Sequence, residues 1–515
     1  MIKNPVLTGF NPDPSIVYVD GVFYIATSTF EYFPGVKISS STDLANWETV
    51  GYPLNEPRLL HMEGNPKSTG VWAPCLSYCD GLFYLVYTDM KYWTNPYKDS
   101  PNYITTAKDI RGPWSDPVFI NCSGFDPSLY HDDDGRKYFV SMEWDYRKTG
   151  DDQFSGILLT ELDPVGLKPI AKPVNIFAGS PRGLVEAPHI YKKDGYYYLF
   201  TAEGGTQYGH AETVVRSKNI YGEYEMHPKV HLICTEGAHD SPLRKTGHGA
   251  IAQSKDGRWW FAFLCGRPLD KTMRCPLGRE TGINEIIWED GWPYLKNKTM
   301  VPDEYFEGYG EQKPQQPILY DFKSPQFLLD FQSLRSKPKF SVGEDGALRI
   351  WGGNSPYCNF GQNSLLRRQT DFNFTASTSF KLSGENFQQM AGLMYRYDEA
   401  THYFLRVYND AETGKSTVGF ISADAGAFSI PVETEIPAGG VIHMKLAVKG
   451  RRGIFSYSLD GTDYTDIPHE IDVSTLSDDY AQPLGFTGAF VGMCCVDMRD
   501  KTSWADFYHF EYIPQ

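Results

Sequence analysis

Residues 13–24 read Asp-Pro-Ser-Ile-Val-Tyr-Val-Asp-Gly-Val-Phe-Tyr, and this stretch sets the pattern of the first part of the chain. An Asp-Gly pair between two apolar runs is the strongest short-range signal for a β-hairpin. The pair recurs at steps of 60, 54, 60 and 62 residues, each time ahead of an aromatic residue, as Asp20-Gly21, Asp80-Gly81, Asp134-Gly135, Asp194-Gly195 and Asp256-Gly257. Five such units without helical periodicity predict a five-bladed β-propeller.

A second short element lies seven or eight residues before each Asp-Gly pair, where the first strand of each unit should begin. It reads Asp13-Pro14, Ala73-Pro74, Asp126-Pro127, Ala187-Pro188 and Gly247-His248. Proline is tolerated in sheets only at edges and strand starts. In a propeller the innermost strand of each blade is an edge strand beside the central channel. The recurrent proline therefore fits a first strand that borders the channel.

The pattern changes after the fifth unit, which places a propeller domain at residues 1–306. Residues 307–318 are polar and rich in Gly and Pro, so they are predicted to form a linker. Beyond them, Ile442, Met444, Leu446 and Val448 alternate with less apolar residues, as expected for half-buried strands. Residues 319–515 are therefore predicted to form a β-sandwich, and the whole chain is expected to be all-β.

Composition excludes several partners. The 515 residues carry 48 Lys and Arg against 64 Asp and Glu, a net charge of −16, which disfavours nucleic acid and anionic membranes as partners. No apolar window is long enough to span a bilayer, and the N-terminus shows no apolar signal segment. The nine cysteines lack the spacing of a disulfide framework or zinc site, so free thiols in a reducing compartment, most simply the cytoplasm, are expected.

Three acidic residues lie at the expected inner ends of first strands. Asp13 and Asp126 occupy the same position in units one and three, and Glu186 lies one residue before the matching Ala187. Because two units have alanine at that position, the fold itself does not require a carboxylate there. Clustered acids repel one another when ionised and so raise one another's pKa, and such unfavourable clusters are typical of catalytic sites. In the fifth unit, a one-residue bulge would place His248 at the position of Glu186.

A pair of carboxyl groups in an aromatic pocket is the minimum requirement for glycoside hydrolysis. A protonated carboxyl donates to the leaving oxygen, while an ionised one activates water or attacks the sugar. A third carboxylate can raise the pKa of the acid. A structural calcium site is the competing interpretation, but the neighbouring Trp72 and Phe125 favour a sugar ring over a hydrated ion.

Five segments carry a family resemblance. They are Asn11-Pro12-Asp13-Pro14-Ser15, Trp72-Ala73-Pro74, Phe125-Asp126-Pro127-Ser128, Val185-Glu186-Ala187-Pro188 and Leu277-Gly278-Arg279-Glu280-Thr281. Together they resemble glycoside hydrolase family 43, and most closely its two-domain β-xylosidases, which often also cleave α-L-arabinofuranosides. The resemblance extends over essentially the whole chain. It implies an inverting enzyme with a five-bladed propeller and an appended β-sandwich.

The resemblance also implies roles for individual residues. Asp13 matches the general base, Glu186 the general acid, and Asp126 the residue that modulates the pKa and orientation of the acid. The positions that match contacts to the sugar or the pocket mouth are Phe30, Trp72, Ala73, Phe125, Thr206, His248, Arg279 and, from the sandwich, Phe507. Tyr508 departs from the acidic residue expected after Phe507. No cofactor is required, although the resemblance leaves open a divalent cation such as Ca²⁺ near His248.

The predicted function is an exo-acting, inverting β-xylosidase that releases terminal xylose from β-1,4-xylo-oligosaccharides, with α-L-arabinofuranosidase side activity. A sandwich that reaches back over the propeller mouth would wall it into a one-ended pocket. The alternatives are a main activity on arabinofuranosides, a non-catalytic carbohydrate-binding propeller and a protein scaffold. A retaining fructosyl-transferring propeller is disfavoured because Phe125, and not arginine, precedes Asp126. Assembly into a homo-oligomer is left open.

Overall fold

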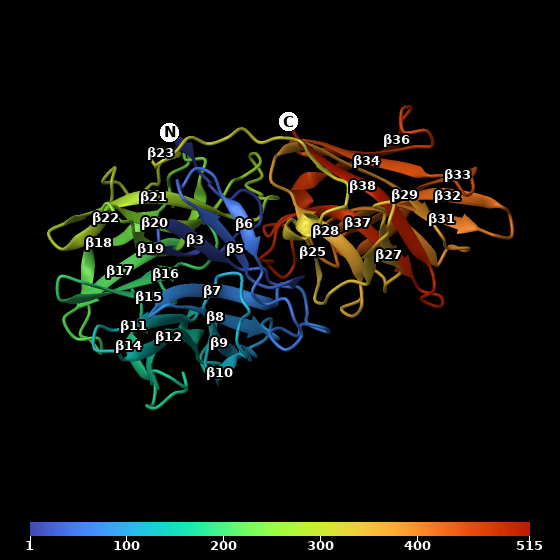
Figure 1. Cartoon of the computed structure of the whole chain (residues 1–515). Helices are drawn as coiled ribbons and strands as arrows, with labels where there is room; N and C mark the ends of the chain where they lie inside the picture. The colour runs from blue at the N-terminus through green and yellow to red at the C-terminus, as the bar shows by residue number, and fades with distance from the viewer.

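The computed structural model describes residues 1–515, which form two β-domains placed side by side (Figure 1). Five four-stranded antiparallel sheets make up the first domain, and the first strands of successive sheets contact one another in a closed ring. Blades one and two contain β2 (Ser15–Val19), β3 (Val22–Thr27), β5 (Lys37–Ser41), β6 (Glu48–Gly51), β7 (Gly70–Cys79), β8 (Leu82–Met90), β9 (Asn102–Ala107) and β10 (Val118–Asn121). Blades three and four contain β11 (Ser128–His131), β12 (Lys137–Trp144), β13 (Phe154–Leu162), β14 (Val174–Phe177), β15 (Glu186–Lys193), β16 (Tyr196–Glu203), β17 (Ala211–Ser217) and β18 (Glu225–Cys234). Blade five contains β19 (Arg244–Gln253), β20 (Trp259–Gly266), β21 (Arg279–Glu289) and β22 (Trp292–Leu295). The predicted five-bladed propeller is confirmed.

The Asp-Gly hairpins use two kinds of turn. In blades one, two and four both turn residues have positive φ, as in Asp20 (48°) and Gly21 (89°), the geometry of a tight two-residue turn. In blades three and five only the glycine of the pair has a positive φ, 87° at Gly135 and 88° at Gly257. These two turns contain one more residue, so the Asp-Gly pair lies eight rather than seven residues after the inner end of the first strand.

This extra turn residue corrects the predicted place of His248. The five blades share a left-handed residue at one position near the inner end of the first strand: Asp13 (φ 55°), Ala73 (28°), Asp126 (52°), Ala187 (51°) and His248 (47°). His248 therefore corresponds to Ala187, and Gly247 takes the position of Glu186. The prediction was wrong because it attributed the longer spacing in the fifth unit to the strand and not to the turn.

The ring closes between blades five and one. β1 (Ile2–Lys3) pairs with β23 (Tyr305–Phe306), and Leu7 forms a bridge with Thr281. A hydrophobic cluster then joins the two blades, with Ile16 and Phe23 from blade one and Trp260 and Ile283 from blade five. Full burial of such side chains contributes about 1.5–3 kcal/mol each, so closure rests mainly on apolar packing.

The second domain is a sandwich of two large sheets. The first contains, in order, β26 (Phe340–Val342), β27 (Leu348–Trp351), β38 (Trp504–Pro514), β29 (Asn373–Leu382), β34 (Ile442–Lys449), β35 (Arg452–Ser458) and β36 (Thr465–Asp472), with β24 (Ile318–Tyr320) paired to β38. The second contains β33 (Ala427–Pro437), β32 (Lys415–Asp424), β31 (His402–Asp410), β30 (Gln389–Arg396), β37 (Phe490–Asp497), β28 (Asn363–Arg368), β25 (Phe331–Leu334) and β4 (Tyr32–Phe33). The predicted sandwich is therefore present, and its second sheet ends in a strand that the propeller donates.

The two domains share a hydrophobic core. Tyr32 of the propeller stacks on Phe490 of the sandwich with ring centroids 3.8 Å apart, and Phe10 packs on Phe490 at 5.8 Å. The cluster around these rings contains buried side chains of both domains. Such apolar burial, together with the shared β4–β25 pairing, fixes the domains to each other more firmly than a typical polar interdomain contact would.

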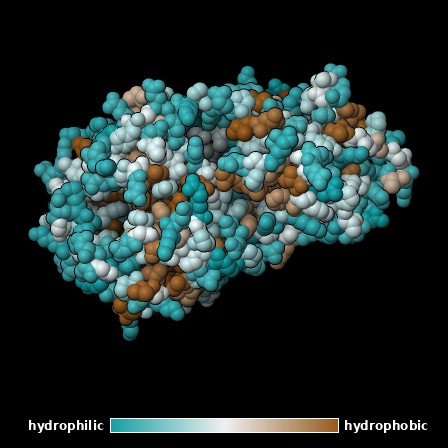
Figure 2. Space-filling model, in the orientation of Figure 1, coloured by the Kyte–Doolittle hydropathy of each residue, from teal (hydrophilic) through white to brown (hydrophobic).

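On the face shown in Figure 2 the surface is mainly hydrophilic, with separate hydrophobic patches over both domains.

The helical segments are three short 3₁₀ turns, η1 (Gly150–Gln153), η2 (Pro325–Leu329) and η3 (Val473–Thr475). No helix in the protein has the length and apolar character needed to traverse a lipid bilayer. All nine cysteines are free thiols, and six of them are buried; the reducing compartment stays a prediction.

Candidate active site

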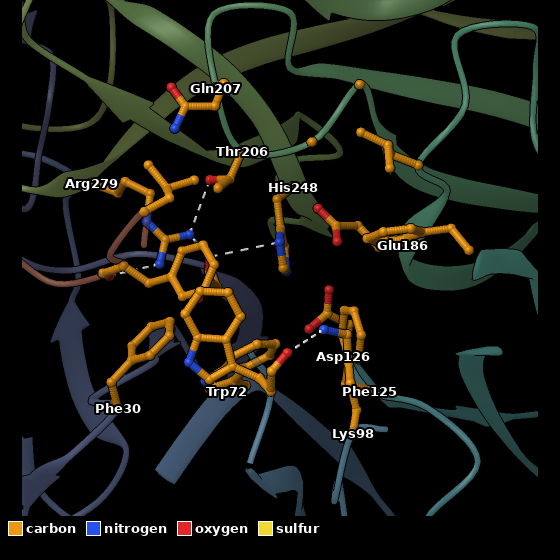
Figure 3. Close-up of a pocket in the computed structure, with 18 residues that line it drawn as sticks. Phe30, Trp72, Lys98, Phe125, Asp126, Glu186, Thr206, Gln207, His248 and Arg279 are labelled. Carbon is orange, nitrogen blue, oxygen red and sulfur yellow. Dashed lines mark hydrogen bonds and ion pairs between the residues drawn. The ribbon is translucent and has the colours of Figure 1, made fainter. Parts of the chain in front are cut away.

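The inner ends of the propeller strands surround a pocket of about 300 Å³ beside the domain interface. Figure 3 shows its side chains converging from several blades. The pocket is lined by Asp13, Phe30, Trp72, Trp93, Lys98, Phe125, Asp126, Phe154, Leu184, Glu186, Gly204, Gly205, Thr206, Gln207, His248, Arg279, Leu484 and Phe486. Nine of the eleven predicted site residues are therefore brought together here, all except Ala73 and Phe507.

Asp13 is held among hydrogen-bond donors. Its side chain is buried, Oδ2 accepts a hydrogen bond from Ser28 Oγ at 2.6 Å, and Oδ1 accepts one from Arg279 Nη1 at 3.1 Å. His248 Nδ1 lies 3.7 Å from the same Oδ1. Donors and a guanidinium stabilise a carboxylate over a carboxylic acid, so the arrangement suits an ionised Asp13.

Glu186 begins β15 and lines the same pocket. Burial raises the pKa of Glu186 to about 8, and the nearby charge of Asp13 adds to this effect, while Arg279 and Lys98 oppose it. A carboxyl with such a pKa is mostly protonated at neutral pH. The pocket therefore contains one carboxyl suited to donate a proton and one suited to accept a proton.

Asp126 is close enough to Asp13 and Glu186 for both of their charges to affect its pKa. Its pKa is raised well above the usual range, first by burial and then by the charges of Glu186 and Asp13, while Arg279 and the backbone N–H of Ala187 oppose the rise. Three acids around one cavity cannot all ionise without strong repulsion. The negative charge is favoured on Asp13, which has the most donors.

Aromatic rings form one wall of the pocket. Trp72 contacts Phe125, Phe486 and Phe30 with ring centroids 5.3, 5.4 and 5.8 Å apart. The indole Nε1 of Trp72 donates to the Ser68 carbonyl at 3.0 Å, which fixes the ring. Such a wall presents apolar faces to the C–H groups of a sugar.

Arg279 connects the acids to the neighbouring loops. Its Nη1 also donates to Thr206 Oγ1 at 3.1 Å, and its Nη2 donates to the Phe486 carbonyl at 2.8 Å. The guanidinium lies 5.3 Å from the centroid of the Phe30 ring. The predicted residues Arg279, Thr206 and Phe30 therefore line the pocket as one connected group.

Ala73 follows Trp72 in the chain but does not line the pocket. Its φ of 28° and its burial place it in the bulge at the inner end of β7. Its small side chain fits this crowded turn, where Trp72 on one side and Pro74 on the other continue the strand.

Phe507 is the predicted site residue that the structure contradicts. It lies in β38, opposite Leu348 of β27, and is fully buried in the sandwich core, 5.0 Å from the ring of Phe380. Because strand residues alternate between faces, Tyr508 points outward and Phe507 inward. Phe486 is the sandwich aromatic in the pocket; it lies in the loop before β37, and no strand pattern marks it.

The pocket also contains residues from positions that the repeated sequence elements do not mark. Trp93 and Lys98 lie in the long connection between β8 and β9, Phe154 begins β13, and Leu484 belongs to the loop of Phe486. Lys98 Nζ lies 4.0 Å from the ring centroid of Trp144, and burial lowers its pKa to about 8, with Glu186 opposing the shift. The only sequence signal for this group is the aromatic richness of residues 92–97.

Few side chains near His248 could act as ligands of a metal ion. No group of three or more His, Cys, Asp or Glu side chains converges in the protein to hold an ion. His248 faces Asp13 and the cationic Arg279, a neighbourhood that lacks the several oxygen ligands Ca²⁺ prefers. These side chains by themselves do not supply the ligand set of a calcium site.

A five-bladed propeller with an acid, a base and an aromatic wall in one pocket has the architecture of a glycoside hydrolase. The family model for glycosyl hydrolases family 43 matches residues 2–293, and the model for the beta xylosidase C-terminal Concanavalin A-like domain matches residues 320–513. The chain belongs to glycosyl hydrolase family 43.

Three relatives span the whole chain. It is 43% identical to xylosidase/arabinosidase 43B of Humicola insolens, with 100% of this chain and 98% of that protein aligned. It is 40% identical to a beta-xylosidase of Bacillus subtilis, with 99% of each chain aligned. The crystal structure of xylan beta-1,4-xylosidase from Bacillus halodurans superposes with a TM-score of 0.96 at 42% identity, covering 100% of both chains. Each match includes both domains.

Proposed function

We propose that this family 43 enzyme is an exo-acting, inverting β-xylosidase with α-L-arabinofuranosidase side activity. The observation that carries the proposal is the pairing, in one small pocket, of Glu186, whose pKa is raised, with Asp13, which is held by Arg279 and Ser28. The names of the relatives support xylosides and arabinofuranosides as substrates.

In this mechanism Asp13 acts as the general base and Glu186 as the general acid. Asp13 removes a proton from a water molecule as its oxygen attacks the anomeric carbon. Glu186 gives its proton to the glycosidic oxygen as the bond to that oxygen breaks. One water is consumed, the anomeric configuration inverts, and both carboxyls return to their starting states by exchanging protons with solvent.

Asp126 acts on Glu186 and not on the sugar bond directly in this proposal. A hydrogen bond from the Ala187 N–H holds Asp126 beside the strand that carries Glu186. Asp126 therefore helps keep the acid in place.

The side chains that the sandwich adds to the pocket support the exo action. Phe486 and Leu484 come from the sandwich and face the propeller residues, with Phe486 4.7 Å from the ring of Trp93. A cavity of about 300 Å³ fits one sugar unit with part of a second. We infer that a terminal pentose enters and that the rest of the oligosaccharide extends outward.

The test is hydrolysis of nitrophenyl β-xyloside, with nitrophenyl α-L-arabinofuranoside and sucrose as comparison substrates. We expect rapid nitrophenol release from the xyloside, slower release from the arabinofuranoside and no cleavage of sucrose. Proton NMR of the first xylose formed should show the α-anomer. Initial β-xylose would contradict inversion, and failure to cleave either aryl glycoside would contradict the proposed specificity.

A further inference from the structure

The sandwich reaches the active site through a single loop, residues 476–489, between η3 and β37. Phe486 N donates to Ser68 Oγ at 3.1 Å, and Ala489 N donates to the Pro276 carbonyl at 2.9 Å. At Gly485 an added Cβ would lie 1.8 Å from Tyr397 Oη. The loop is therefore closely packed against both domains and holds a defined conformation.

Asp478 of this loop points toward the active-site arginine. It is 3% exposed, its Oδ1 accepts a hydrogen bond from Tyr397 Oη at 2.6 Å, and its Oδ2 lies 3.8 Å from Arg279 Nε. Arg279 Nε is buried and has no hydrogen-bond partner. The other guanidinium nitrogens are bound by Asp13, Thr206 and the Phe486 carbonyl. Asp478 is therefore the anion paired with the remaining nitrogen.

We propose that Asp478, a residue of the sandwich, is a positioning residue for the glycosidase reaction and sets the orientation of Arg279 against Asp13 and the terminal sugar. The inference rests on the proposed function for its kinetic test. It assigns the second domain an electrostatic contribution to the active site, in addition to the aromatic wall formed by Phe486.

The surroundings of Asp478 make this contribution depend on pH. The groups that face it are Arg279 and Lys245 from the propeller, Tyr397 and Asp479 from the sandwich, and the Cys275 thiol nearby. Burial raises the pKa of Asp478 to about 7, while Arg279 and Lys245 oppose the rise. Above this pH the carboxylate attracts Arg279; below it the neutral carboxyl attracts it less.

Asp478→Asn reproduces the neutral form at every pH. We expect kcat/KM of the wild type and the variant to be nearly equal at acidic pH, and to diverge to about fivefold in favour of the wild type above pH 7, mainly through KM. The ratio of the two kcat/KM values cancels a titration that both enzymes share, such as that of Glu186. Tyr397→Phe removes a hydrogen bond that lowers the pKa of Asp478, so the divergence should begin at higher pH.

Asp371→Asn is the matched control. Asp371 is also a sandwich carboxyl whose pKa burial raises, but its partners are Thr370 and Tyr512 and not Arg279. The ratio of kcat/KM between the wild type and Asp371→Asn should not change with pH. A flat ratio for Asp478→Asn as well would show a merely structural role and overturn the proposal.

A crystal structure of Asp478→Asn separates this proposal from the proposed function. We expect the guanidinium of Arg279 to turn away from Asp13; an unchanged arginine would overturn the positioning role. A wild type that cleaves neither aryl glycoside would refute the proposed specificity, and the structure of the variant would still decide the role of Asp478.

Discussion

Replacing Phe486 by alanine tests whether the sandwich forms part of the sugar pocket. The ring lies 4.7 Å from Trp93, 5.4 Å from Trp72 and 5.9 Å from Phe30, and its loss removes these contacts together with stacking on the sugar. The ring–ring contacts exist with and without the sugar, so their loss lowers stability, whereas the stacking on the sugar is lost from transition-state binding. One aromatic contact contributes about 0.5–1.5 kcal/mol, which corresponds to a decrease in kcat/KM of roughly 2–13-fold.

The assay is initial-rate hydrolysis of xylobiose by proteins whose folded fraction has been checked by thermal unfolding. Backbone contacts of residue 486 to Ser68 and Arg279 remain in the variant, so the loop should keep its place. The control is Phe507→Leu, a change in the sandwich core that should lower the melting temperature and leave kcat/KM of the folded enzyme unchanged. Normal kinetics for Phe486→Ala, or a selective kinetic loss for Phe507→Leu, would refute the reasoning.

Three further predictions concern the acids and the domain interface. Glu186→Ala should lose about 10²–10⁴-fold in kcat on xylobiose but much less on aryl xylosides with good leaving groups, whereas Asp13→Ala should lose activity on both; equal losses would contradict the two roles. Because burial raises the pKa of Glu186 to about 8, xylobiose hydrolysis should decline as pH rises through that value, since the acid loses its proton; a pH-rate profile that stays level to pH 10 would argue against Glu186 as the acid. A chain cut after residue 306 should aggregate and bind hydrophobic dyes, because Phe10 and Tyr32 lose their cover; a folded propeller that hydrolyses xylobiose normally would show that the sandwich is dispensable.

The repeat in the sequence was sufficient to predict the propeller, because hairpin turns and strand-start prolines follow from local backbone chemistry. It also located Asp13, Asp126 and Glu186, because equivalent strand ends converge on one axis. His248 was misaligned, since a longer turn and a bulged strand give the same spacing in sequence. Phe486 was missed because its loop has no periodicity, and its contact with Trp72 exists only through the packing of the two domains.

The domain interface and the active site are parts of one hydrogen-bonded structure. Glu31, fully buried beside β4, accepts a hydrogen bond from Ser68 N at 3.0 Å. Ser68 in turn accepts from Trp72 Nε1 through its carbonyl and from Phe486 N through its hydroxyl. The strand that the propeller donates to the sandwich is thus two hydrogen bonds away from two pocket aromatics. Movement of the sandwich would displace these rings, so we expect the second domain to act as a fixed wall of the pocket and not as a lid that opens with each turnover.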